Sequence, residues 1–138
     1  MAEAGRIAMD ANVLIYLHKD TPRGRRYARH LEGAVGVVPF PAVAEVLLNA
    51  RRTRNRALTE QFWRRELALY VIVQPDLDTC ALWAELTAHT RAQGRPYKDN
   101  DLRIAACAVQ HDLPLMTHNP RHFEHLAGLT VIHGPDPE

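Results

Sequence analysis

The chain has 138 residues, of which 46% are hydrophobic, and it carries a net charge of +1. This length suits a single domain with a substantial core, and the hydrophobic content excludes a disordered chain. The apolar runs are too short to span a bilayer, no secretory leader is evident, and no strong net charge argues for nucleic acid. We therefore expect one cytoplasmic domain over residues 1–138, with 133–138 as a loose tail.

Short apolar runs alternate with helical stretches in the first half of the chain. Strands are predicted where these runs stop at an acid or a proline, at 7–9, 35–38 and 70–73. Helices are predicted at 13–17, 25–31, 42–51 and 59–69. Asp10 or Asn12 can cap the first helix and Thr59 the last, while Pro22 and Gly24 are expected to break the chain.

The same alternation continues to the end of the chain. Helices are predicted at 79–93, 99–109 and 120–126, and strands at 113–116 and 129–132. Asp78 and Asn119 can cap two of these helices. The pattern predicts an α/β fold, a three-layer α/β/α sandwich with a mostly parallel sheet of four to five short strands. Cys80 and Cys107 are expected to be buried free thiols.

Three acids lie in apolar surroundings far apart in the sequence. Asp10 follows the first strand, Glu45 lies inside an apolar helix, and Asp101 lies in the first turn of an alanine-rich helix. Sites in open parallel sheets form beyond the carboxyl ends of the strands, where Asp10, Thr117 and His118 are expected. A carboxylate buried without a partner is costly. We therefore expect the fold to gather Asp10, Glu45 and Asp101 around a hard cation.

Each of these residues also has a purely structural interpretation. Asp10 can be a helix cap, and Asp101 can interact with the helix dipole. Glu45 can face solvent or pair with a distant arginine, because no cation lies three or four positions away from it. Capping alone explains Asn119, and His118 is expected to be an exposed loop histidine.

The residue types indicate which metal ion and which chemistry to expect. Carboxylates without clustered cysteine or histidine suit magnesium or manganese and not zinc. Such an ion lowers the pKa of a bound water and neutralises phosphoryl oxygens. Hydrolysis of a phosphodiester is the implied reaction.

These residues resemble a PIN-domain ribonuclease, specifically a VapC-type toxin of a bacterial toxin–antitoxin pair. The resemblance rests on segments that follow one another in the family's order, at 9–14, 44–46, 100–106, 113–123 and 128–131. It implies magnesium-dependent endonucleolytic cleavage of RNA, a cognate antitoxin as partner, and a homodimer. No membrane association is implied.

The resemblance places the family's first three acidic positions at Asp10, Glu45 and Asp101, which would hold the metal ion. A fourth position falls at Asn119, an amide, so the number of metal ions stays open. Thr117 or Asn119 is expected to orient the attacking water. Two basic stretches, 23–26 and 51–56, are candidates for contacts with RNA, with the antitoxin, or only with solvent.

Other functions are also compatible with an α/β fold. No glycine-rich phosphate loop is present, which argues against a nucleotide-binding protein. No lysine follows the last strand, unlike in phospho-acceptor signalling domains. A metal-dependent phosphatase and a non-catalytic, partner-binding PIN-like protein remain as alternatives.

Overall fold

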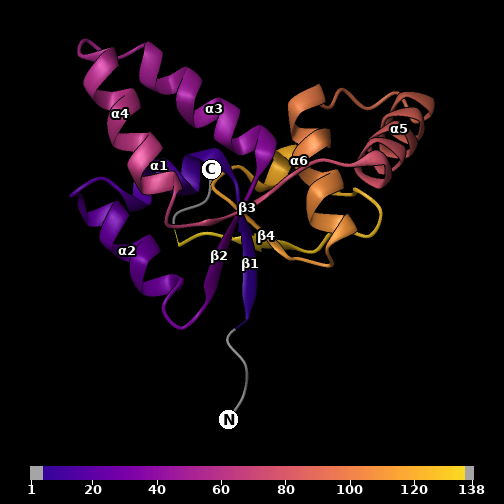
Figure 1. The fold of residues 1–138 in the computed structure, drawn as a ribbon. Helices are drawn as coiled ribbons and strands as arrows, with labels where there is room; N and C mark the ends of the chain where they lie inside the picture. The colour runs from indigo at the N-terminus through magenta and orange to yellow at the C-terminus, as the bar shows by residue number, and fades with distance from the viewer. Residues whose placement is uncertain (1–4, 136–138) are drawn as a thin grey trace.

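The computed structural model describes residues 5–135 and contains a single five-stranded sheet (Figure 1). The strands lie in the order β3-β2-β1-β4-β5, and every neighbouring pair is parallel. Their bounds are β1 Arg6–Met9, β2 Val35–Pro39, β3 Val71–Val73, β4 Leu115–Thr117 and β5 Val131–His133. The predicted parallel sheet is therefore confirmed.

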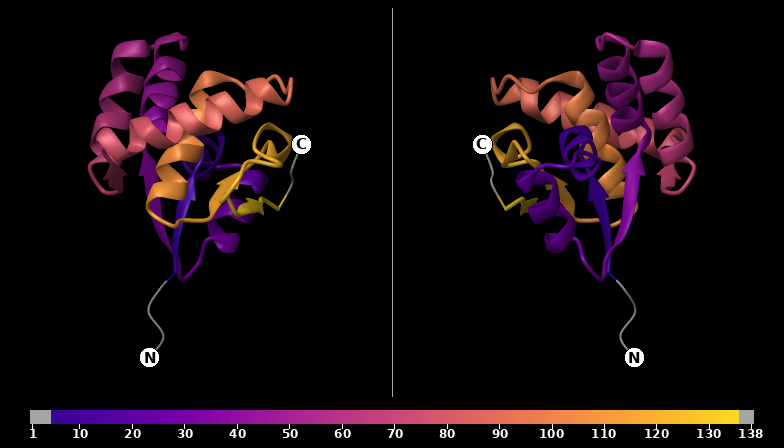
Figure 2. Two further views of the ribbon diagram at one scale, coloured as in Figure 1. Left: turned by 90° about the vertical axis from the view of Figure 1, so that its right-hand side faces the viewer. Right: turned by 90° about the vertical axis from the view of Figure 1, so that its left-hand side faces the viewer.

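Helices connect the strands and form a layer on each side of the sheet. Figure 1 shows α1 and α2 to the left of the sheet and α5 and α6 to its right, and Figure 2 shows the same layers from both sides. This arrangement confirms the predicted three-layer sandwich. The bounds are α1 Ala11–Leu17, α2 Pro22–His30, α3 Phe40–Arg51, α4 Arg56–Leu67, α5 Leu77–Ala92, α6 Asp99–Gln110, and the 3₁₀ turn η1 Pro120–His122.

Helix α6 is the best-buried helix of the core. Ala105, Ala106 and Ala108 are fully buried on it, and their small side chains let the helix approach its neighbours closely. Helix α6 contacts α3, α5 and β2, so its first turn lies next to the carboxyl ends of the central strands. In the described part of the chain, no helix is long and apolar enough to cross a membrane.

Helix α2 begins earlier than predicted. Pro22 and Gly24 do not break the chain but form its first turn, where the Thr21 hydroxyl accepts a hydrogen bond of 3.0 Å from the Gly24 N–H. Gly24 is buried, and a Cβ there would lie 2.3 Å from the Lys19 carbonyl oxygen. Only glycine fits this close backbone approach.

The caps of two further helices differ from prediction. Helix α4 begins at Arg56, and Thr59 bonds back to the Asn55 carbonyl instead of capping. Helix α5 is capped by Asp76 and not by Asp78, because Asp76 and Thr79 form a reciprocal capping box.

Two other sequence predictions need correction. Cys80 is exposed and only Cys107 is buried, so one of the two predicted buried thiols is wrong. The predicted loose tail begins too early, since His133 belongs to β5 and Gly134 is buried. Residues 136–138 lie outside the described residues.

Candidate active site

Asp10 lies directly after β1, buried at 5% exposure, and its carboxylate is held on both oxygens. The Ala11 N–H donates to Oδ1 at 2.8 Å, and the Thr117 hydroxyl donates to Oδ2 at 2.8 Å. Burial raises the pKa of Asp10 to about 6, although both hydrogen bonds act to lower it. Asp10 therefore caps α1, as the structural interpretation predicted. It also contacts Thr117 at the carboxyl end of β4.

Thr117 and Asn119 follow β4 beside Asp10. The Thr117 side chain is buried, and its hydroxyl accepts a 3.1 Å hydrogen bond from the Asn119 N–H while it donates to Asp10. Asn119 does not cap η1 through its side chain, so that expectation is wrong. The parallel pairing of β1 with β4 explains why residues 107 positions apart meet here.

Glu45 lies half-buried on α3 and contacts the first turn of α6. Its carboxylate accepts a hydrogen bond from the Asn100 side-chain amide, which also donates weakly to the Pro41 carbonyl at 3.4 Å. Among the described residues, Glu45 forms no ion pair with an arginine, so the predicted alternative of a distant arginine partner is not supported. Sequence analysis assigned no role to Asn100, because this contact joins residues 55 positions apart.

Asp101 lies in the first turn of α6, with only 7% exposure. Its Oδ2 lies 3.6 Å from the Nδ1 of His122, a residue that sequence analysis did not select. Burial is the main cause that raises the pKa of Asp101 to about 6, the negative charge of Glu45 adds to it, and Lys98 lowers it.

The three acids act on one another electrostatically. Glu45 and Asp101 each raise the pKa of Asp10, and Glu45 raises that of Asp101. Within residues 5–135, however, no three His, Cys, Asp or Glu side chains stand close enough to form a ready-made metal cage. The two observations are compatible, because charges influence one another over about 10 Å, well beyond metal–ligand bonds.

Magnesium suits such a loose set of oxygens, because it keeps several waters and needs only one or two carboxylates bound directly. The donor set of Asp10, Glu45 and Asp101 is entirely carboxylate oxygen. Asp10 and Asp101 are buried and have raised pKa values. A bound cation would stabilise their ionised forms and so offset the cost of burying their charges. The residues present therefore fit a magnesium ion.

Two clefts contain one each of the acids Asp101 and Glu45. One, of about 320 Å³, contains Asp101 beside Lys98, Arg121 and His122, and we call it the Asp101 cleft. The other, of about 440 Å³, contains Glu45 beside Asn12, Arg52 and Lys98, and we call it the Glu45 cleft. Lys98 lines both clefts.

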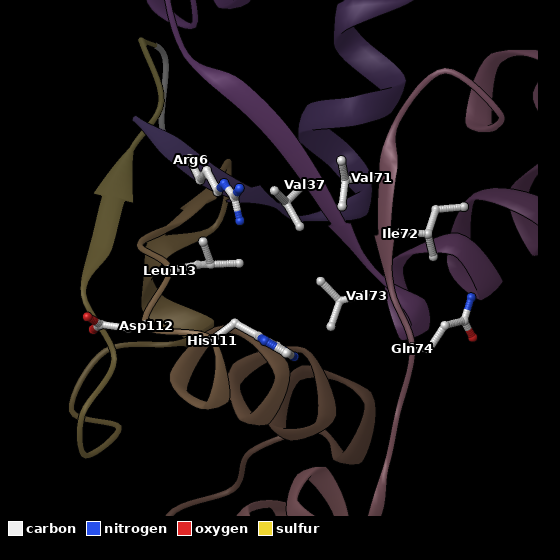
Figure 3. Close-up of a pocket in the computed structure, with 9 residues that line it drawn as sticks. All are labelled: Arg6, Val37, Val71, Ile72, Val73, Gln74, His111, Asp112 and Leu113. Carbon is white, nitrogen blue, oxygen red and sulfur yellow. The ribbon is translucent and has the colours of Figure 1, made fainter. Parts of the chain in front are cut away.

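A larger hollow of about 560 Å³ lies elsewhere, between Arg6 at the start of β1, the whole of β3 with Gln74 after it, and residues 111–113 after α6 (Figure 3). Val37, Val73 and Leu113 line it, with Arg6 and His111 at its edge. It holds none of the three acids.

His118 lies in the loop after β4 and is buried, so the prediction of an exposed loop histidine is wrong. Its Nδ1 shares a 2.7 Å hydrogen bond with the Tyr27 hydroxyl of α2, and its backbone N–H lies 3.4 Å from the Asn12 side-chain oxygen. These contacts join α1, α2 and the strand end that carries Thr117. No local sequence pattern indicates them.

Comparison with known proteins identifies the family. The model of the PIN domain matches residues 7–129. Ribonuclease VapC1 of Haemophilus influenzae (strain R2866) is 30% identical over 128 residues, which cover 88% of this chain and 92% of that protein. Among solved structures, VapBC2 from Rickettsia felis, bound to a DNA fragment from their promoter, has a TM-score of 0.82 at 18% identity and covers 94% of this chain and 98% of that one. A toxin–antitoxin complex from Klebsiella pneumoniae has a TM-score of 0.70 at 24% identity, covering 91% and 96%. The chain belongs to the PIN-domain family, among the VapC ribonucleases.

Proposed function

We propose that the protein is a magnesium-dependent endoribonuclease, the toxin of a toxin–antitoxin pair, and that Asp10, Glu45 and Asp101 hold the ion. The observation that carries this proposal is the mutual electrostatic effect of three carboxylates that lie 35 and 56 positions apart along the chain. Membership of the PIN family and the name of the Haemophilus ribonuclease support RNA as the substrate.

The side chains around Asp10 are arranged to present an ionised carboxylate. The Ala11 N–H and the Thr117 hydroxyl each donate to a different Asp10 oxygen, which favours the charged form. Asn100 fixes the carboxylate of Glu45 in the same way. When bound, a magnesium ion would supply an activated water and would stabilise charge on the phosphate.

Thr117 and Asn119 are proposed to orient the attacking water. The Thr117 hydroxyl already bridges the Asn119 backbone and Asp10, so it lies next to the acid that would bind the ion. The Asn119 side chain makes no capping bond to η1 and is half-buried beside Thr117. Because Asn119 is neutral, one metal ion is the number that we propose.

Two partners are proposed in addition to cytoplasmic RNA. A cognate antitoxin is supported by the solved toxin–antitoxin complex from Klebsiella pneumoniae that shares this fold. A homodimer is supported by the family resemblance and by large apolar side chains that one chain leaves exposed, including Leu69 at 80% and Leu77 at 84%. Copurification with a neighbouring gene product and the mass of the purified protein in solution test these two points.

Incubation of the purified protein with total RNA, with and without magnesium, tests the proposed activity. New RNA ends are expected only with magnesium, and Asp10→Asn and Asp101→Asn should abolish them while the exposed Asp78→Asn should not. Cleavage by either site variant at the wild-type rate would refute the assignment. Release of phosphate from small esters without RNA cleavage would favour a phosphatase, and no activity with either would favour a partner-binding protein.

A further inference from the structure

Basic side chains gather beside Asp101 and Glu45 although the whole chain has a net charge of only +1. In the Asp101 cleft, Arg95, Lys98, Arg121 and His122 surround a single acid. In the Glu45 cleft, Arg52 and Lys98 accompany Glu45. The cations come from three separate segments that the fold brings together, and of them only Arg52 belongs to a basic run in the sequence.

Lys98 connects the two clefts. It precedes α6 and lines the Asp101 cleft on one side and the Glu45 cleft on the other. Asp101 lines the same cleft as Lys98, and Glu45 lines the other cleft beside it. A ligand that crosses from one cleft to the other therefore passes Asp101, Lys98 and Glu45.

We propose that the two clefts form one track for single-stranded RNA, with Lys98 at their junction. Arg95 and Arg121 would bind backbone phosphates on one side of the cleavage point, and Arg52 would bind them on the other side. Arginine suits this task because its planar fork matches phosphate oxygens. Pro96 and Tyr97 add apolar surface beside the cations, which suits a base next to its phosphate.

This inference rests on the proposed function, because cleavage within an RNA strand requires a phosphate among the acids with further phosphates on both sides. It also revises the predicted RNA contacts. Of the two basic stretches selected from sequence, only Arg52 lines a cleft beside the acids. An acidic peptide could use the same arginines, and it is treated below as an opposing outcome.

The test is a binding measurement without metal, so that it does not depend on cleavage. Fluorescence anisotropy of a labelled 12-nucleotide single-stranded RNA is followed with the full chain in EDTA at several salt concentrations. Arg52→Ala, Arg95→Ala, Lys98→Ala and Arg121→Ala are compared with Arg65→Ala, a matched exposed arginine of α4 that lines neither cleft. Because all five side chains are exposed, the folded state should tolerate their removal.

Each of the four cleft variants should reduce the slope of log K against log salt by about 0.7, the value for one lost phosphate contact on a single strand. Arg65→Ala should keep the wild-type slope, and Lys98→Arg should restore it. Wild-type slopes in the four variants would overturn the track even if magnesium-dependent cleavage is found. Effects confined to one cleft, or binding of an acidic peptide but not of RNA, would overturn it as well. A reduced slope in the four variants, in a protein that cleaves no RNA, would instead support the RNA track and refute the proposed nuclease activity.

Discussion

Replacing Asp10 by asparagine should stabilise the metal-free protein at neutral pH. The carboxylate of Asp10 is buried beside two other acids, and burial raises its pKa from 3.8 to about 6. Asparagine keeps an oxygen for the Ala11 N–H, and the Thr117 hydroxyl can accept from the new amide, but the hydrogen of that hydroxyl loses Asp10 as its acceptor. The variant therefore removes a buried charge at the cost of one hydrogen bond donated by Thr117, which is the smaller of the two effects.

The magnitude follows from the difference between the two pKa values. At about 1.4 kcal/mol per pKa unit, the rise from 3.8 to about 6 corresponds to about 3 kcal/mol. Because the pKa is higher in the folded state, the folded protein binds more protons between about pH 4 and pH 6. The free energy of unfolding contributed by Asp10 is therefore largest below pH 4 and is lost as the pH rises past 6.

Thermal and urea unfolding in EDTA between pH 4.5 and 7.5 can measure this effect. Asp10→Asn should flatten the decline in stability over this range and should raise the melting temperature at pH 7.5 by up to about 10 °C. Asp78→Asn is the matched control, since Asp78 is exposed in the first turn of α5 and should change stability by less than about 1 kcal/mol. An Asp10→Asn protein that is less stable than wild type at pH 7.5, with the same pH dependence, would refute this account of the site.

Three further outcomes are expected. Glu45→Gln should remove most of the magnesium-dependent rise in melting temperature, whereas the exposed Glu85→Gln should retain it; equal rises would place Glu45 outside the metal site. Thr117→Val should raise the pKa of Asp10 further, because the hydrogen bond that it removes stabilises the ionised carboxylate. NMR titration of the carboxyl group would detect the higher pKa, and a cleavage assay would detect a lower rate. Gly24→Ala should cost about 1–3 kcal/mol in urea unfolding, since its Cβ would lie within 2.5 Å of two backbone oxygens, while Gly5→Ala should be silent.

The order of strands and helices was predictable because each element carries its own signal. Apolar runs that stop at Asp10 or Pro39 read as buried strands, and the alanine-rich stretch after Asp99 reads as a helix that packs closely. Their alternation leads to a parallel sheet with little further information. The placement of Asp10 and Thr117 beyond adjacent strand ends follows from that topology.

Features that depend on distant contacts were not predictable. Asp76 and Asp78 are both good caps by sequence, and the choice of Asp76 is reinforced by Gln110 of α6, which donates to it at 2.7 Å. The partner of Glu45 is Asn100, and the neighbour of Asp101 is His122, each brought close only by folding. The same reason explains why His118 is buried against Tyr27 and not exposed in its loop.

The two cysteines can report how often helix α6 separates from the sheet. Cys80 is exposed on α5, whereas Cys107 is fully buried on α6, where burial raises the pKa of the thiol to about 11. A thiol-modifying reagent attacks the thiolate, so it should label Cys80 in the native state and reach Cys107 only when α6 separates from the sheet. The labelling rate at Cys107 thus measures how often the helix that carries Asp101 detaches, without any substitution in the chain.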